Sequence, residues 1–210
     1  MIDFDNIKEK GFFKAFVLTW KKSLFSPEIF FGEITSDDNV LHPYFYAVIF
    51  GYVNLVFSFF WEIFFFKIGF YSNYSFLPKI PLLFAHKDTI TLFIIFGILI
   101  LLIFFGILYS LFLLLLSTIL HGFIRLFGGK KHFRYTFRII CYTAGVNLFS
   151  IMPIFGYNII LAWFFALTAI GIKKTEGIST AKSIIIVLLP YIFISLIMIT
   201  FIIKIITTRN

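Results

Sequence analysis

The chain has 210 residues, of which 60% are hydrophobic and 13% are charged, with a net charge of +8 and a mean hydropathy of +1.01. A soluble protein of this size cannot bury so much apolar surface in one core. The composition excludes a soluble enzyme, a disordered chain and a secreted disulfide scaffold, the last also because Cys141 is the only cysteine. It predicts an all-α fold, a polytopic membrane helix bundle.

Residues 6–25 have the apolar spacing of an amphipathic helix. Its apolar stripe comprises Phe13, Phe16, Val17, Trp20 and Leu24. Lysines on the other faces favour a helix that lies in the membrane interface, and a helix packed on the protein's own cytoplasmic end explains the pattern equally well. Ser26-Pro27 ends this helix, and the polar run 33–39 is a connector.

Residues 43–206 are predicted to form a membrane domain, and residues 1–42 the N-terminal helix and its connector. Five spans are expected, at about 44–66, 90–124, 135–152, 156–172 and 183–203. Residues 89–124 form a charge-free run, which is too short for two spans and a turn, so we expect one long helix that projects from the bilayer. Breakers at Pro153, Gly156 and Asn158 predict a hairpin between the third and fourth spans, and Pro190 predicts a kink in the fifth.

The distribution of Lys and Arg predicts the orientation. With five spans, 13 of these residues fall on one side of the membrane and five on the other. Because positively charged loops stay in the cytoplasm, the N-terminus is expected inside the cell and the C-terminus outside.

The sequence offers no catalytic constellation, and we expect no cofactor and no metal. The four histidines do not have the spacing of an HExxH motif. Gly128-Gly129-Lys130-Lys131 is not a phosphate-binding P-loop, because Ile124 stands where that motif needs its first glycine. The basic net charge is read as a topology signal, so no nucleic-acid partner is expected.

One polar face crosses the first predicted span. Gly51, Asn54, Ser58 and Glu62 follow one another in steps of three or four residues, and Asn147 of the third span is expected to complete this seam. An ionisable residue inside a span suggests a substrate or proton site. A structural polar seam inside the bundle is the other reading.

Arg125, Lys130, Lys131 and Arg134 form a dense basic cluster between the second and third spans, and Arg138 follows one turn later. Enforcement of topology explains part of the cluster. We also expect contact with anionic lipid headgroups or a partner protein, because each charge near an anionic leaflet is worth about 1 kcal/mol. Lysines of the N-terminal helix and the pair at 173–174 would complete a basic collar.

Three segments carry a family resemblance: HPYFYAVIFGY from His42, LHGFIRLFGGKKHFRYTFRIICYTAG from Leu120, and AWFFALTAIGIKKTEGISTAKSIIIVLLP from Ala162. In order and spacing they resemble the Yip (Ypt/Rab-GTPase-interacting protein) membrane-domain family in its prokaryotic form. The resemblance implies five spans, an N-terminus in the cytoplasm, and a link to membrane traffic in eukaryotic members. SPEIFF at Ser26 replaces the acidic segment of those members, which argues against binding of a Rab-type GTPase.

The leading functional hypothesis is a non-enzymatic scaffold or adaptor that organises partner proteins or lipids at the cytoplasmic face. The alternative is a small transporter or lipid-handling protein that uses the face formed by Asn54, Ser58 and Glu62. A prokaryotic inner membrane is the expected location. Membrane lipids are the expected partners, the protein partner is unknown, and a homo-oligomer is left open.

Overall fold

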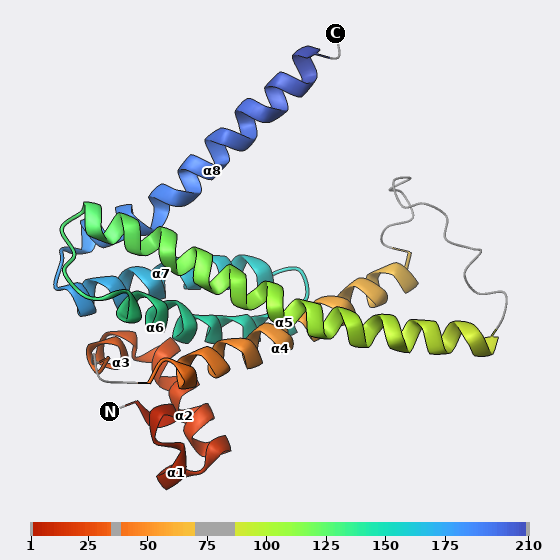
Figure 1. Ribbon diagram of the computed structural model, residues 1–210, viewed down its shortest axis with the longest axis horizontal. Coiled ribbons are helices and arrows are strands. Elements are labelled where there is room, and N and C mark those ends of the chain that lie inside the picture. The colour runs from red at the N-terminus through yellow and green to blue at the C-terminus, as the bar shows by residue number, and fades with distance from the viewer. Residues whose placement is uncertain (1, 35–38, 70–86, 209–210) are drawn as a thin grey trace.

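The computed structural model describes residues 2–34, 39–69 and 87–208, and all regular secondary structure in these ranges is helical (Figure 1). The elements are η1 (Asp3–Asn6), α1 (Ile7–Lys10), α2 (Phe12–Phe25), α3 (Pro27–Gly32), α4 (Leu41–Lys67), α5 (Lys87–Leu126), α6 (Phe133–Thr143), η3 (Ala144–Ile151), α7 (Gly156–Glu176) and α8 (Thr180–Thr208), where η marks a 3₁₀ helix. The predicted all-α fold class is therefore correct.

Four of these helices are long and apolar enough to cross a membrane. The candidate spans are Leu41–Phe65 in α4, Ile100–Leu126 in α5, Gly156–Glu176 in α7 and Thr180–Thr200 in α8. They coincide with four of the five spans expected from hydropathy. The chain is thus a multi-pass membrane protein built from apolar helices.

The long charge-free run does form one helix. α5 has 40 residues, which corresponds to about 60 Å at the rise of an α-helix. Figure 1 shows its N-terminal part extending away from α6 and α7. The length of the charge-free run was therefore sufficient to predict a single helix that is longer than the hydrocarbon core.

The third predicted span is divided between α6 and the 3₁₀ helix η3 (Ala144–Ile151), neither of which is long enough to count as a span by itself. α6 packs against α4, α5 and α7, and every residue from Tyr135 to Val146 is buried. At rises of about 1.5 and 2.0 Å per residue, α6 and η3 together reach roughly 32 Å. The 3₁₀ winding therefore lengthens a central element that would otherwise be short.

The predicted hairpin is present between η3 and α7. Its turn includes Ile154, whose φ of 65° is rare for a β-branched residue. At Gly156 an added Cβ would lie 2.4 Å from the carbonyl oxygen of Phe149. Glycine therefore allows α7 to begin directly against the backbone of η3.

The last helix, α8, contains Pro190 and changes direction part-way along its length, as expected (Figure 1).

The expected continuous helix over residues 6–25 is wrong, because Gly11 interrupts it. Its φ of 77° separates α1 from α2, and such a conformation favours glycine. The prediction that Ser26-Pro27 ends the helix is correct, although a short helix, α3, follows at once. The polar connector falls largely on residues 35–38, which lie outside the described residues.

The apolar stripe of α2 is split between two environments. Leu24 is buried, and the indole Nε1 of Trp20 donates a hydrogen bond to the carbonyl oxygen of Gly145 at 3.0 Å. Phe13 and Val17 remain exposed, at 78% and 41%. One side of α2 therefore packs on the protein itself, which agrees with the second reading of the pattern. Location of the exposed side in the membrane interface stays a prediction.

Two acidic residues hold the N-terminal segment in place: Asp3 links η1 to α1 and α2, and Asp5 links this segment to α6. The buried carboxylate of Asp3 pairs with Lys10 and Lys22. Burial raises the pKa of Asp3, but hydrogen bonds and charge from both lysines outweigh this effect, so the pKa lies below its ordinary value. Asp5 accepts hydrogen bonds from Arg138 at 2.7 Å and from the Tyr142 hydroxyl at 2.9 Å.

Candidate functional site

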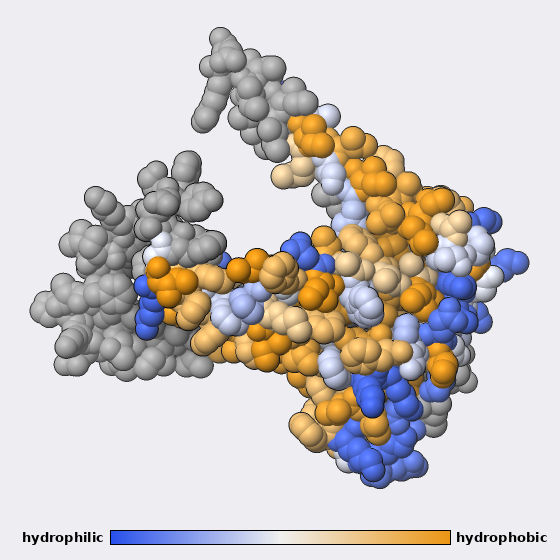
Figure 2. Space-filling model, turned by 180° about the vertical axis from the view of Figure 1, so that it is seen from behind, coloured by the Kyte–Doolittle hydropathy of each residue, from blue (hydrophilic) through white to orange (hydrophobic). Residues whose placement is uncertain are grey.

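The predicted basic cluster lies at one end of the helix bundle. We call Arg125, Lys130, Lys131 and Arg134 the basic loop; all four are exposed. Figure 2 shows hydrophilic residues gathered at this end and over the N-terminal helices, whereas hydrophobic residues cover the long helices. The structure therefore separates a polar end of the molecule from apolar flanks that suit a bilayer.

Two glycines and one glutamate determine the conformation of the basic loop. Gly128 has a φ of 90°, and an added Cβ at Gly129 would lie 2.3 Å from a methyl carbon of Ile124. The Glu176 carboxylate, at the end of α7, accepts hydrogen bonds from the backbone N–H groups of Lys130 and Lys131 at 2.8 and 3.1 Å. Because this acid binds the backbone N–H groups, it holds the loop in place without forming an ion pair with either ammonium group.

The expected basic collar is divided into paired and unpaired charges. Lys10 and Lys22 share Asp3, and Lys173 and Lys174 lie 3.6 and 2.9 Å from the Glu28 carboxylate. Both lysines lower the pKa of Glu28, with the Lys174 hydrogen bond contributing most. These four lysines are therefore partly neutralised within the protein.

The basic loop differs from these four paired lysines. Within the part of the chain that the structure describes, none of its four side chains forms an ion pair with a carboxylate. Lys131 lies over the Tyr135 ring, 5.3 Å from its centroid, and Arg125 contacts His121 and the Gly129 carbonyl. Lys14 and Lys21 of α2 are also exposed and form no ion pair among the described residues. The basic loop is therefore the densest group of charges in the collar that are available to an external anion.

Arg138 does not belong to this surface, although the sequence places it in the same basic run. Its side chain is 1% exposed and binds Asp5, and its guanidinium also donates to the Asn39 carbonyl. No local signal reveals this pair, because its two members are 133 residues apart. Arg138 serves to dock the N-terminal segment.

The intramembrane polar seam forms only in part. Asn54 and Ser58 are half-buried, and the Ser58 hydroxyl lies 2.7 Å from the hydroxyl of Tyr157 on α7. Asn147 donates separately to the Tyr109 hydroxyl at 3.3 Å. The structure thus links Ser58 to α7 and gives Asn147 a different partner.

The expectation that the whole face points into the bundle is wrong at Glu62, because the Glu62 side chain is exposed. The neighbouring Phe59, Phe60 and Ile63 are exposed as well, so this end of α4 has few neighbours among the described residues. Trp61 makes the inward contact here, with its indole Nε1 donating to the Ser150 carbonyl at 3.1 Å. Helical periodicity indicated a shared face but not where along α4 the bundle ends.

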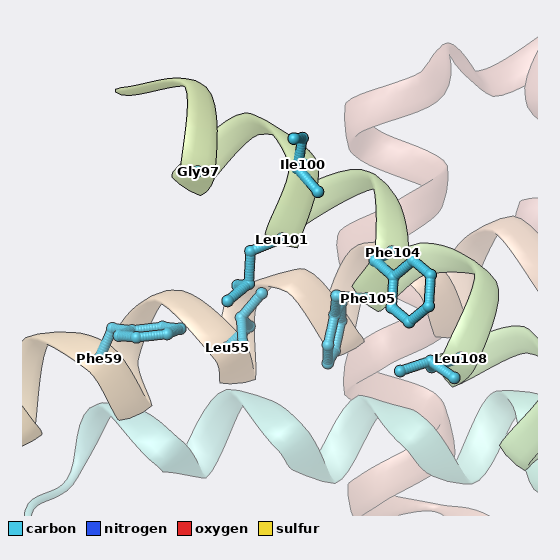
Figure 3. A pocket seen from close by; sticks show the side chains of 8 residues that line it. All are labelled: Leu55, Phe59, Gly97, Ile100, Leu101, Phe104, Phe105 and Leu108. Atoms are coloured by element: carbon cyan, nitrogen blue, oxygen red, sulfur yellow. The ribbon is translucent and has the colours of Figure 1, made fainter. Parts of the chain in front are cut away.

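An apolar groove of about 550 Å³ lies between α4 and α5. It is lined by Leu55, Phe59, Gly97, Ile100, Leu101, Phe104, Phe105 and Leu108, as Figure 3 shows. These side chains offer no hydrogen-bonding atom, so the groove suits hydrocarbon.

Among the described residues, no group of three or more His, Cys, Asp or Glu side chains could hold a metal ion.

Comparison with known proteins identifies the family. The family model described as the Yip1 domain matches residues 21–202, which is most of the chain. The chain therefore belongs to the Yip1 domain family, as the order of its motifs predicted. No curated protein and no solved structure matches the chain.

Proposed function

We propose that this Yip1-domain protein is a non-enzymatic scaffold or adaptor that organises lipids, and through them partner proteins, at the cytoplasmic face of a prokaryotic inner membrane. The observation that carries this proposal is the basic loop: four exposed cations without a carboxylate partner among the described residues. Anionic headgroups supply the missing negative charge. No contact with a GTPase is proposed.

The proposal includes five spans with the N-terminus inside. The combined length of α6 and η3, about 32 Å by helical rise, supports a fifth crossing of a core of roughly 30 Å. The five-span arrangement places the basic loop, the N-terminal lysines and residues 173–174 on one side of the membrane. This side carries the excess of Lys and Arg that cytoplasmic loops have.

Cysteine accessibility in intact cells tests this orientation. Cys141 is buried, so its replacement by alanine provides a background without a native thiol. A cysteine at Ser72, which lies outside the described residues, is expected to react with an impermeant maleimide. A cysteine at the exposed Ser179 is expected to react only after permeabilisation. The reverse labelling pattern would rule out the proposed orientation.

Lipid retention tests the role of the basic loop. The variant Lys130→Gln, Lys131→Gln, Arg134→Gln removes three unpaired charges, each worth about 1 kcal/mol near an anionic surface. We expect its preference for anionic over zwitterionic lipid, measured as lipid co-purified from nanodiscs at low salt, to fall at least about tenfold. Added salt should reduce the wild-type preference, because exposed charges are screened.

A charge-matched control separates local from general electrostatics. Lys67→Gln, Lys87→Gln, Lys204→Gln removes the same charge from the opposite side of the five-span arrangement. Its lipid preference should stay close to that of the wild type. The contrary result is equal preference for anionic lipid in the wild type and the basic-loop variant, with unchanged fold and orientation. That result would show that the basic loop acts only as a topology signal.

The alternative function is a small transporter or lipid-handling protein that uses the Asn54 and Ser58 face. One observation favours it: Oδ1 of Asn54 is buried, and no described residue donates a hydrogen bond to it. Another observation argues against it: Glu62, the only carboxylate of that face, is exposed and lies outside the bundle. Substrate flux in proteoliposomes that is lost on Asn54→Leu, with lipid retention unchanged, would favour this alternative.

A further inference from the structure

A second groove lies directly beside the basic loop, where α4, α5 and the start of α6 meet. It has a volume of about 370 Å³, which falls within the usual range for small-molecule sites, roughly 300–1,000 Å³. Its lining residues are Val40, Leu41, Tyr44, Ser110, Leu114, Phe133, Arg134 and Phe137. Apart from Arg134 and one hydroxyl pair, this lining is hydrocarbon or aromatic.

Arg134 gives this groove a positive charge at its edge. The side chain is exposed and forms no ion pair among the described residues. A guanidinium presents several donors that match the oxygens of a phosphate group. The groove thus combines an apolar surface with a single cation suited to phosphate.

The apolar surface continues along α5 away from Arg134. An adjoining groove shares Tyr44 and Ser110 with the first and extends to Ile103. The Tyr44 hydroxyl donates to the Ser110 hydroxyl at 2.8 Å, and Ser110 donates to the Gly106 carbonyl at 2.6 Å, so neither hydroxyl presents an unpaired donor to the hydrocarbon. From Leu114 to Ile103 the two grooves follow α5 for about 16 Å at helical rise. One leaflet of the hydrocarbon core measures roughly 15 Å, half of the usual thickness.

We propose that the two joined grooves bind one anionic phospholipid, with an acyl chain along α4 and α5 and its phosphate on Arg134. This inference rests on the proposed function and adds the ligand class and a defined site to it. The occupant is a diacyl phospholipid because the charge lies at one end of an apolar surface as long as one leaflet. The groove in Figure 3 lacks such a charge, so it binds no particular headgroup.

The test fills the proposed site without touching the charges. Leu114 lines the groove and is 46% exposed, so Leu114→Trp places an indole where the acyl chain would lie. Leu101→Trp makes the same change in the groove of Figure 3 and serves as the matched control. Native mass spectrometry of the detergent-purified protein, titrated with phosphatidylglycerol or phosphatidylcholine, measures occupancy of the tightest site.

We expect Leu114→Trp to weaken phosphatidylglycerol binding about tenfold, and Leu101→Trp to change it by less than about twofold. Arg134→Gln should reduce the preference for phosphatidylglycerol over phosphatidylcholine to near unity. Soluble glycerophosphate should compete poorly, because it lacks the chain that fills the groove. Circular dichroism should show the same helix content in all variants.

Two results would overturn the inference. Unchanged phosphatidylglycerol binding by Leu114→Trp would show that no chain lies in the groove. Strong competition by glycerophosphate would show a phosphate site without a chain. If the triple variant of the basic loop loses anionic lipid while Leu114→Trp does not, the proposed function stands and this site fails. If neither variant loses anionic lipid, both fail.

Discussion

Replacement of Asp5 by alanine is expected to destabilise the protein by about 3 kcal/mol, because it removes a carboxylate that pairs with a buried arginine and also accepts a hydrogen bond from a tyrosine. Arg138 is 1% exposed and lies 2.7 Å from Asp5, which also accepts from Tyr142. A guanidinium that loses this partner keeps its desolvation cost and loses the charge that Asp5 contributed. We therefore expect η1 and α1 to detach from α6.

Hydrogen exchange over residues 2–11 and the unfolding free energy in mixed micelles measure this effect. Asp5→Asn keeps some hydrogen-bonding capacity and should cost less than Asp5→Ala. Glu9→Ala removes an exposed acid from the same segment and should stay within about 0.5 kcal/mol of the wild type. Protection of residues 2–11 in Asp5→Ala equal to that in the wild type would contradict a docking role for the pair.

The spans were predictable because hydropathy and charge act over many neighbouring residues. In α5 the charge-free run alone defines the helix, and the hairpin before Gly156 follows from local breakers. The 3₁₀ winding of η3 was not predictable, because it depends on what the central element packs against. A hydrophobicity scale depends only on residue types, and the residue types of η3 do not differ from those of an α-helix.

The same distinction between local patterns and long-range packing applies to the candidate site. Exposure of the basic loop follows from a local cluster of charge, and the sequence indicated it. Pairing decides which basic residues are available, and the pairs of Asp5 and Glu28 join segments far apart in the chain. The groove beside Arg134 also needs three helices to be placed together. Sequence patterns therefore identified the charged residues but not the site that one of them completes.

Replacement of Gly156 by alanine is expected to destabilise the protein by about 1–3 kcal/mol, the usual cost of overpacking. The added Cβ would lie 2.4 Å from the Phe149 carbonyl oxygen and 3.4 Å from Cα of Ser150. Both neighbours are backbone atoms, so no rotamer change relieves the contact. The start of α7 would have to move away from η3, and the hydrogen bond from Trp61 to the Ser150 carbonyl would be disturbed.

Gly122→Ala is the matched control, because it makes the same substitution where an added Cβ meets no atom within 4 Å. Alanine inside α5 should stabilise the helix by about 0.5–1 kcal/mol relative to glycine. The two variants should therefore shift the unfolding free energy in mixed micelles in opposite directions. A stabilising effect at both positions would mean that α7 does not begin against η3. The hairpin would then not require glycine at position 156. Opposite signs would instead show that α7 begins in close contact with the backbone of η3, a contact that only glycine allows at Gly156.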